Sequence, residues 1–225
     1  ANLLNTNIQD VAQMPYDTFC RKIENLTRKV ASGKLIVKEY PTAVANANHF
    51  RHLLNELSLK KNFRPDVIYI DYLNICSSSR IKAGSGANSY TLIKSIAEEL
   101  RGLAVEHNVP IMSATQTTRS GYNSSDVELT DTSESFGLPA TADLMFALIA
   151  TEELEELNQV LVKQLKNRYN DLNNYKRFVI GIDRPKMRLY DVENSAQDEV
   201  IDNSGSSQDY SNNFSNNSKK IGSVE

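Results

Sequence analysis

The sequence predicts an α/β fold in which helices flank a mostly parallel sheet and a β-hairpin extends the sheet toward the C-terminus. Two apolar runs, residues 67–70 and 109–115, predict strands, and the first is typical of a strand buried on both faces of a parallel sheet. Residues 90–107 between them carry apolar side chains at helical spacing. Strand, helix and strand in this order predict a βαβ crossover, which brings the carboxyl ends of both strands to one edge of the sheet.

Three helices and one strand are expected before the first of these runs. The apolar spacing in residues 1–14 predicts a short amphipathic helix, and Pro15 is suited to begin a second helix that ends near Gly33. Residues 35–40 are typical of a strand that ends at a proline. Residues 46–60 place their apolar side chains on one face of a helix.

Five elements and a tail are expected after the second run. Residues 142–149 form a third apolar strand, and residues 152–156 form an acidic helix with a solvated face. Three β-like segments at 160–169, 176–183 and 187–192 predict a hairpin meander that extends the sheet. Serine and asparagine dominate from residue 194 onward, so residues 194–225 are predicted to be a disordered tail.

Polar side chains follow the predicted strands where ligands bind in open α/β sheets. Asp71 follows the first apolar run and Gln116 follows the second, so both are expected at a binding crevice. Two long loops, residues 77–89 and 119–139, leave the same edge, and loops of this length are usually functional or disordered. Simpler interpretations stay open, namely a strand-end polar residue bonded to backbone and two mobile surface loops.

Composition and charge describe an ordinary globular chain. Hydrophobic residues make up 40% and charged residues 24% of its 225 positions, enough for one α/β domain and a tail. No apolar run approaches the ~18 residues that a membrane span needs. Two cysteines are too few for a disulfide framework, which fits a reducing cytoplasm. Residues 1–190 carry 23 basic and 21 acidic residues, a balance that does not exclude nucleic acid held by local loops.

In this order the motifs resemble those of the C-terminal motor domain of DnaB-type replicative helicases, closest to the T-even-phage type. Asp71-Tyr72-Leu73 resembles the family's Walker B motif, and residues 113–119 resemble its Ser-Gln-Leu-Asn-Arg motif. Glu134-Ser135, Leu138 and Ala142-Asp143 resemble its Glu-Ser-Gly-Ser-Ile-Glu-Gln-Asp-Ala-Asp stretch, and Lys166-Asn167-Arg168 resembles its Lys-x-Arg motif. The resemblance covers residues 1–193 and implies a RecA-like helicase motor domain there, followed by the tail 194–225.

For catalysis, the resemblance implies ATP as the nucleotide and Mg²⁺ as its metal ion. Asp71 would hold Mg²⁺ through water, as hard oxygen ligands do. Gln116 can donate and accept hydrogen bonds, which suits a sensor of the γ-phosphate or of its attacking water. Arg168 would act as an arginine finger in a neighbouring subunit's site, with Lys166 beside it as a point charge. The simpler interpretation of this pair is two exposed cations on a strand.

For the second substrate, the resemblance implies a hexameric ring that moves 5′ to 3′ along single-stranded DNA in a phage replisome. Primase and a helicase loader would be its partners, and the cytoplasm of a bacterial host its location. The two loops would line the channel and contact phosphates with little regard to sequence. The cationic candidates are Arg80, Lys82 and Arg119. The segment that grips phosphates would contain Glu134, Ser135 and Phe136.

Departures from the family pattern concern the DNA contacts and the phosphate-binding loop. Thr141 occupies the position of a family aspartate, and Ser133 that of a family arginine. The glycine that the family has two residues after its Lys-x-Arg motif is replaced here by Asn170. No Gly-x-x-x-x-Gly-Lys-Ser/Thr phosphate loop occurs in the sequence. In the family, that loop and the catalytic glutamate precede the position of Ala1. The chain is therefore expected to be a truncated piece that is inactive alone in ATP hydrolysis.

Three other interpretations stay open at this point. A degenerate ATPase-like domain would never have possessed the phosphate loop. Another RecA-like ATPase or recombinase would share the acid at position 71 and the glutamine at position 116. A non-catalytic binding domain would use the sheet as a scaffold and the loops to hold a partner.

Overall fold

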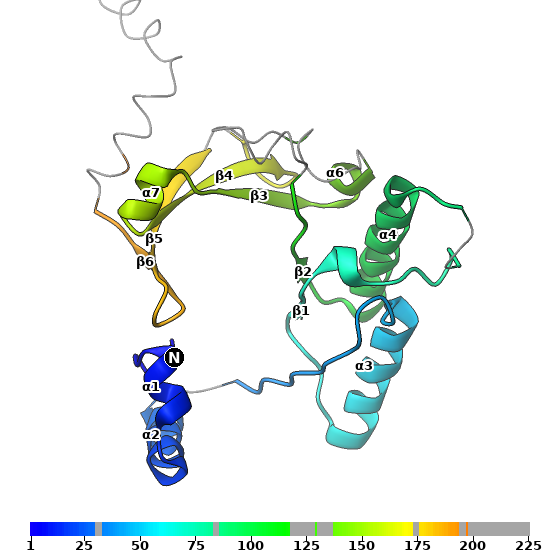
Figure 1. Ribbon diagram of the computed structural model, residues 1–225. Helices are drawn as coiled ribbons and strands as arrows, with labels where there is room; N and C mark the ends of the chain where they lie inside the picture. Colours follow the sequence, from blue (N-terminus) through cyan, green and yellow to red (C-terminus); the bar gives the residue numbers. More distant parts are fainter. Residues whose placement is uncertain are drawn as a thin grey trace, which may run out of the picture. The chain divides into compact units, whose positions relative to one another are not determined.

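The computed structural model describes residues 1–29, 33–82, 86–117, 129, 137–172, 176–193 and 197. Figure 1 labels its helices and strands. Its contacts divide the chain into two compact units. Unit 1 comprises Ala1–Lys22, Ala150–Val162 and the part from Arg177 onward, and unit 2 comprises Ile23–Ile149 and Lys163–Lys176. Every described residue to which the sequence assigned a catalytic or DNA-binding role belongs to unit 2.

Unit 2 contains the predicted βαβ crossover. Strand β1 (Ile68–Ile70) pairs in parallel with β2 (Ile111–Ser113), and helix α4 (Ser89–His107) joins them. One face of α4 is buried, so that Ile96 is 1% and Leu103 is 0% exposed. The main apolar cluster consists of side chains from this face, from the short 3-10 helix η1 (Leu73–Ile75) and from helix α6 (Gly137–Thr141): Leu73, Cys76, Ile93, Ile96, Ala97, Leu100 and Leu138.

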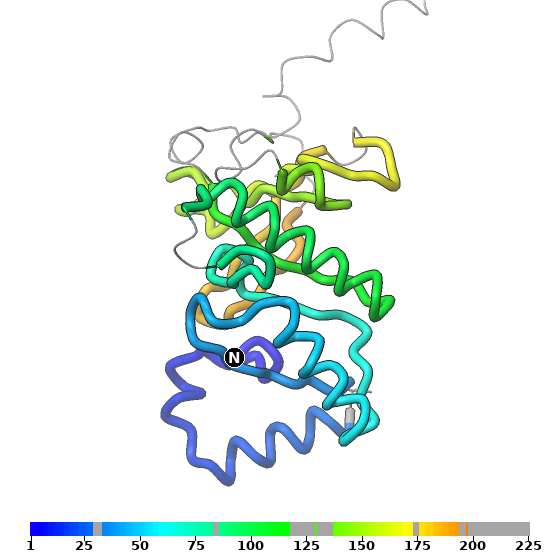
Figure 2. Tube along the Cα trace, turned by 90° about the vertical axis from the view of Figure 1, so that its right-hand side faces the viewer, coloured from blue at the N-terminus to red at the C-terminus, as the bar shows by residue number. Residues whose placement is uncertain are grey.

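Helices α3 (Ala47–Lys61) and α4 are capped at both ends by asparagines, which lie just outside the helix bounds. The Asn46 side chain accepts hydrogen bonds from the backbone of residues 48 and 49, and the Asn88 side chain accepts one from Thr91 at 2.8 Å. Asn62 and Asn108 adopt left-handed backbone conformations, with φ of 47° and 50°, which end the two helices. These caps explain why the predicted helices 46–60 and 90–107 are confirmed to within one residue. The two helices lie side by side (Figure 2).

The C-terminal strands form the second sheet, in the order β3-β4-β5-β6. Their bounds are Leu144–Ile149, Gln159–Asn167, Arg177–Asp183 and Arg188–Asp191. Strands β5 and β6 are antiparallel, with Ile180 opposite Asp191. The acidic helix α7 (Glu152–Glu156) begins at the capping residue Thr151. The predicted fold class, a mostly parallel sheet flanked by helices with a C-terminal β-hairpin extension, is confirmed, but within the described residues the C-terminal strands form a sheet separate from β1 and β2.

The N-terminal helices are also present. Helix α1 (Ile8–Gln13) covers only the second half of the predicted helix 1–14, and α2 (Tyr16–Lys29) follows Pro15 as predicted. In unit 1, the backbone N–H of Ile8 donates to the carbonyl of Pro185 at 2.8 Å. None of the described helices combines the length and the apolar character needed to cross a bilayer.

Three sequence predictions about local structure are wrong. Residues 35–40 belong to no described strand, and Leu35 and Val37 are both 83% exposed. Strand propensity depends on packing against neighbouring strands, and β1 pairs only with β2 within the described residues. The predicted loop 119–139 gives way to α6 from Gly137 onward.

The expected burial of β1 on both faces is the third error. Tyr69 is 72% and Met112 is 53% exposed, whereas Ile70 and Ile111 pack against the core around α4. Side chains alternate between the two faces of a strand. In β1 the exposed Tyr69 stands between two partly buried isoleucines, whereas in β2 both Met112 and Ser113 are exposed. Helices cover only one face of this pair in the described part of unit 2.

Strands β2 and β3 each lie at the edge of their sheet, and they belong to different sheets. On β3 the alternating residues Leu144, Phe146 and Leu148 are 47%, 48% and 70% exposed. An edge strand with exposed apolar side chains offers unpaired backbone donors and acceptors to another chain. Among the described residues of unit 2, the edges formed by β2 and β3 therefore carry exposed apolar side chains.

We expect the chain by itself to self-associate through these edges, in a manner that depends on concentration. Replacing Phe146 and Leu148 together by lysine should reduce the association, because charged side chains protect edge strands. Leu59→Lys is the matched control, since Leu59 is 86% exposed but lies on a helix. Sedimentation equilibrium measures the outcome. A monodisperse monomer with cooperative unfolding would contradict the expectation and favour the degenerate-domain interpretation.

Candidate functional site

The ends of β1 and β2 bring Asp71 and Gln116 to one edge of the parallel pair, as predicted. Ile70 lies opposite Ser113, and the Ser113 hydroxyl donates to the Ile70 carbonyl at 2.8 Å. Beyond the strands, the backbone N–H of Leu73 donates to the carbonyl of Ala114 at 3.2 Å. Asp71 is exposed at this edge, and the peptide bond that follows it is cis.

Gln116 is tied to the residue that follows Asp71. Its side-chain amide donates to the Tyr72 hydroxyl at 3.3 Å. One residue earlier, the Thr115 hydroxyl donates to the Asn74 side chain at 2.9 Å. The two segments that follow the strands are thus joined by side chains as well as by backbone. The roles of Tyr72 and Asn74 were not predicted, because contacts between residues 44 and 41 positions apart leave no mark in the local sequence pattern.

The residues at this edge fit a magnesium ion held mostly by other oxygens. Within the described ranges, no group of three or more His, Cys, Asp and Glu side chains could form a closed metal site. A single exposed carboxylate suits Mg²⁺, which usually keeps several waters and is bound through one or two carboxylates plus substrate phosphates. Asp71 would supply that carboxylate. A phosphate-binding glycine loop is not among the residues present.

The Lys-x-Arg pair lies at the end of β4, and Asp143 holds its arginine. The backbone N–H of Arg168 donates to the Asp143 carbonyl at 3.0 Å, and its guanidinium Nη1 lies 3.1 Å from Asp143 Oδ1. Arg101 of α4 lies 2.8 Å from the same oxygen and also donates to the Thr141 carbonyl at 2.7 Å. Lys166 donates to the Pro139 carbonyl. One carboxylate thus joins α4 to the end of β4.

Burial and neighbouring charges together shift the pKa values of Asp143 and Lys166 in this cluster. Burial alone would raise the pKa of Asp143, but the neighbouring guanidiniums of Arg101 and Arg168 outweigh it and hold the pKa below its usual range. Burial lowers the pKa of Lys166, the two arginines lower it further, and Asp143 opposes them. No hydrogen bond or ion pair of the described residues joins Lys166 or Arg168 to Asp71 or Gln116. The four predicted catalytic residues therefore fall into two separate groups within unit 2.

The first predicted DNA-binding loop, residues 77–89, is described except for residues 83–85. Arg80 and Lys82 are both exposed, and Arg80 Nη1 lies 3.1 Å from Glu98 Oε2 on α4. The remaining candidates, Arg119, Glu134, Ser135 and Phe136, lie outside the described residues. Their DNA-binding roles stay predictions. So does the disordered state of residues 194–225, of which only Gln197 is described, with hydrogen bonds to both backbone groups of Val179.

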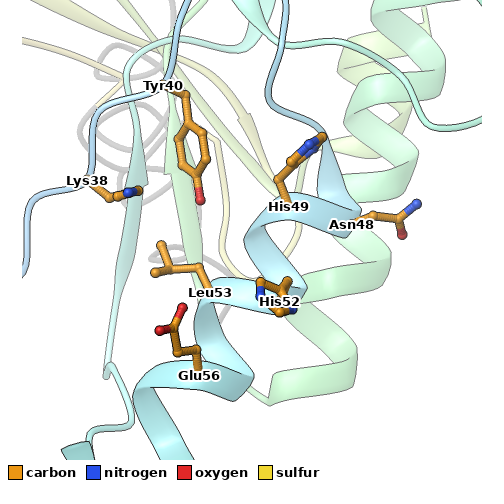
Figure 3. Close-up of a pocket in the computed structure, with 7 residues that line it drawn as sticks. All are labelled: Lys38, Tyr40, Asn48, His49, His52, Leu53 and Glu56. Atoms are coloured by element: carbon orange, nitrogen blue, oxygen red, sulfur yellow. The ribbon is translucent and has the colours of Figure 1, made fainter. Parts of the chain in front are cut away.

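A separate hollow of about 400 Å³ lies between residues 38–40 and α3 (Figure 3). The Tyr40 ring forms one wall, edge-on to His49 with ring centres 6.3 Å apart, and Lys38 Nζ lies 5.7 Å from the centre of the same ring. The lining mixes cationic, acidic and aromatic groups, so it selects no single ligand chemistry, and it contains none of the predicted site residues: Lys38, Tyr40, Asn48, His49, His52, Leu53 and Glu56.

Known proteins resemble the chain over most of its length. A family model described as DnaB-like helicase C terminal domain matches residues 4–184. A DnaB-like replicative helicase of Enterobacteria phage T4 is 46% identical over 211 residues, which are 92% of this chain and 44% of that protein. A probable plasmid replicative DNA helicase of Chlamydia trachomatis is 34% identical over 98 residues, or 43% of this chain and 21% of that protein. The chain thus spans less than half of the length of these curated relatives.

Two solved structures share its fold, each with a TM-score of 0.67 and 17% identity over 85% of this chain. One is an isolated ATPase domain, of which 68% is covered. The other is a DnaB-like replicative helicase solved in a study of its interactions with primase, of which 47% is covered. At this identity the likeness concerns the fold, and it confirms the RecA-like α/β class predicted from the sequence.

Asp143→Asn should make the stability of the chain less dependent on pH. Because the folded-state pKa of Asp143 lies below its ordinary value of 3.8, the carboxylate stabilises the fold above that ordinary value. This contribution is lost as the pH falls through the folded-state pKa. Thermal unfolding between about pH 6 and about pH 2 should therefore show a smaller loss of stability in the variant than in the wild type.

The matched control for that experiment is Asp66→Asn, which changes an exposed aspartate in the same unit. It should leave the pH dependence close to that of the wild type. Equal pH dependence of the wild type and Asp143→Asn would show that the two arginines do not hold the Asp143 carboxylate in the folded chain.

Proposed function

Because the chain belongs to the family of DnaB-like helicase C-terminal domains, we propose that it forms part of the ATP-driven motor of a hexameric replicative DNA helicase. Residues 1–193 would belong to the motor and residues 194–225 would form a tail. The observation that carries the proposal is the hydrogen bond between the ends of the two strands. The Gln116 side chain donates to Tyr72, the residue that follows Asp71.

This geometry suits the hydrolysis of a phosphate anhydride. Phosphoryl transfer relies on positioning and on stabilisation of charge, rather than on covalent chemistry by the protein. Asp71 would hold Mg²⁺ through water, and that ion would neutralise charge on the phosphates. The amide of Gln116 donates to Tyr72, which leaves its carbonyl oxygen as an acceptor suited to orienting a water molecule. Tyr72 would keep that side chain beside the metal-binding carboxylate.

Arg168 would complete a site on a neighbouring subunit. Its side chain is 48% exposed and is oriented by Asp143, and within the described residues no bond joins it to Asp71 or Gln116 of its own chain. A guanidinium that is positioned but not bonded to its own catalytic carboxylate suits an arginine finger supplied in trans. Lys166, two residues earlier on the strand, would add a second positive charge.

Single-stranded DNA would be the track on which this motor moves. Arg80 and Lys82 are exposed on the loop that leaves the same strand end as Asp71, so hydrolysis and DNA contact would be linked by a short stretch of chain. Contacts between such cationic side chains and the phosphate backbone of DNA give affinity without preference for a base sequence. A primase and a loader are the proposed protein partners, and the cytoplasm of a bacterial host is the proposed location.

In the full-length protein, Asp71→Asn and Arg168→Ala should each reduce ATP turnover by at least ~10³, the scale of known arginine-finger losses. The first variant removes the carboxylate that would hold Mg²⁺, and the second removes the positive charge that would act on the phosphates in the transition state. Steady-state ATPase assays on the assembled ring measure the effect. Arg188→Ala is the control, since Arg188 is an exposed arginine on β6.

Mixing the two inactive variants tests whether Arg168 acts across an interface. A mixed ring contains some interfaces with an intact Asp71 on one side and an intact Arg168 on the other, so part of the activity should return. Complete absence of recovery, in rings shown to contain both variants, would contradict the assignment in trans.

Arg80→Ala combined with Lys82→Ala should weaken binding of single-stranded DNA by the full-length protein. Two fewer phosphate contacts should lower the slope of log affinity against log salt by about one to two. Fluorescence anisotropy with a labelled oligonucleotide measures both quantities. Lys60→Ala combined with Lys61→Ala removes the same charge from the end of α3 and should change the slope much less. Unaltered affinity in the loop variant would mean that this loop is only a connector.

A further inference from the structure

The loop that carries Arg80 and Lys82 starts at three serines that are fixed on two sides. On one side, the backbone N–H of Ser77 donates to the Ala45 carbonyl at 2.7 Å, and its hydroxyl lies 3.0 Å from the Val44 carbonyl. On the other side, Ser78 and Ser79 face helix α4. The start of this loop is therefore held between the segment before α3 and the side of α4.

The contact with α4 is made by one carboxylate, that of Glu99. Both oxygens accept the backbone N–H of Ser79, at 3.1 and 2.9 Å, and Oε2 also accepts the Ser79 hydroxyl at 2.6 Å. Oε1 accepts the hydroxyl of Ser78, and the hydroxyl of Ser95, one turn earlier on α4, lies 3.2 Å away. Glu99 is only 6% exposed, although it is charged.

Ser78 links Glu99 to the cationic part of the loop through its hydroxyl group. While its hydroxyl donates to Glu99, its oxygen accepts the backbone N–H of Arg80 at 3.0 Å and that of Ile81 at 3.1 Å. The backbone that carries the Arg80 side chain is thus two hydrogen bonds from the Glu99 carboxylate. Ser78 is itself 8% exposed, so water competes little for these bonds.

The chemistry of this cluster requires an ionised carboxylate. Every group of the loop that faces Glu99 is a hydrogen-bond donor, and an ionised carboxylate is the side chain that only accepts. Burying a charge is costly unless hydrogen bonds compensate for it, and no ion pair of the described residues involves Glu99. A glutamine would fit the same space, but its NH₂ group would meet donors. The buried charge is therefore explained by the loop that it holds.

The preceding residue, Glu98, makes a contact of the opposite kind. It is partly exposed and pairs with the Arg80 guanidinium at 3.1 Å, where it would compete with a phosphate. Two adjacent acids on α4 thus lie beside the same loop. Removal of either takes away one negative charge, but only one of them orders the backbone.

We propose that Glu99 is a positioning residue for DNA binding, which holds Ser78 and Ser79 so that Arg80 and Lys82 are presented to the phosphates of single-stranded DNA. The inference rests on the proposed function, because it requires that this loop contacts DNA. It adds that the affinity depends on a buried acid that does not touch DNA.

The test compares Glu99→Gln with Glu98→Gln in the full-length protein, with a labelled oligothymidylate as the probe. Glu99→Gln should weaken binding by about tenfold, the scale of lost hydrogen bonds to a charged group, and should lower the salt slope. Glu98→Gln should leave the affinity unchanged or raise it. If charge alone mattered, both variants would bind more tightly, and that result would overturn the proposal.

A general folding defect is separated from a positioning role by a double-mutant cycle. In a protein that already carries Arg80→Ala and Lys82→Ala, Glu99→Gln should weaken binding no further, because its effect passes through those two side chains. An equal further loss in that background would overturn the proposal. Ser78→Ala, which keeps the charge but removes the link to Arg80, should reproduce the tenfold loss, and normal binding by this variant would also overturn it.

The same measurements distinguish failure of the inference from failure of the proposed function. If Arg80→Ala with Lys82→Ala does not weaken DNA binding, the proposed DNA contact is wrong and the inference falls with it. If that pair weakens binding while Glu99→Gln does not, the DNA contact stands and only the positioning role is wrong.

Discussion

Burial of one face of α4 is the constraint on which the rest of unit 2 depends. Ile96 and Leu103 are almost completely enclosed, and burial of such side chains contributes about 1.5–3 kcal/mol each, well above the ~1 kcal/mol or less of an exposed ion pair. Apolar packing therefore fixes the helix, and the polar contacts follow from its position. Glu99 then reaches the loop after β1, and Arg101, two residues later, reaches Asp143. One helix orders both the loop proposed to bind DNA and the Lys-x-Arg cluster.

The two groups of candidate catalytic residues are built on different physical terms. Asp71 and Gln116 come together because parallel strands end at the same edge, and the Tyr72 hydroxyl holds the glutamine there. Arg168 is ordered by charge, since Asp143 is shared between Arg168 and Arg101, whereas Lys166 donates to the Pro139 carbonyl. The first group is fixed by backbone pairing that screening by salt does not affect. The second is partly exposed, so it is the part that a phosphate could draw away from its present partner.

The sequence predicted the structure where the determining interactions are local or follow from strand order. The helices around residues 46–61 and 89–107 have asparagine caps and apolar faces, and the edge positions of Asp71 and Gln116 follow from the βαβ crossover. The prediction failed for residues 35–40, whose strand-like pattern needs a neighbour that the described residues do not provide. The Arg101–Asp143–Arg168 cluster and the Glu99 contacts could not be predicted, because they join residues 42, 25 and 20 positions apart through side chains that look solvent-facing in the sequence.

The most direct measurement of the central claim is an experimental structure of the assembled full-length protein with a non-hydrolysable ATP analogue, Mg²⁺ and single-stranded DNA. We expect Asp71 and Gln116 to lie at the triphosphate bound by their own subunit, Arg168 to lie at the triphosphate of a neighbour, and Arg80 and Lys82 to contact DNA phosphates. A nucleotide bound away from Asp71, with Arg168 still paired only to Asp143 and remote from every triphosphate, would contradict it.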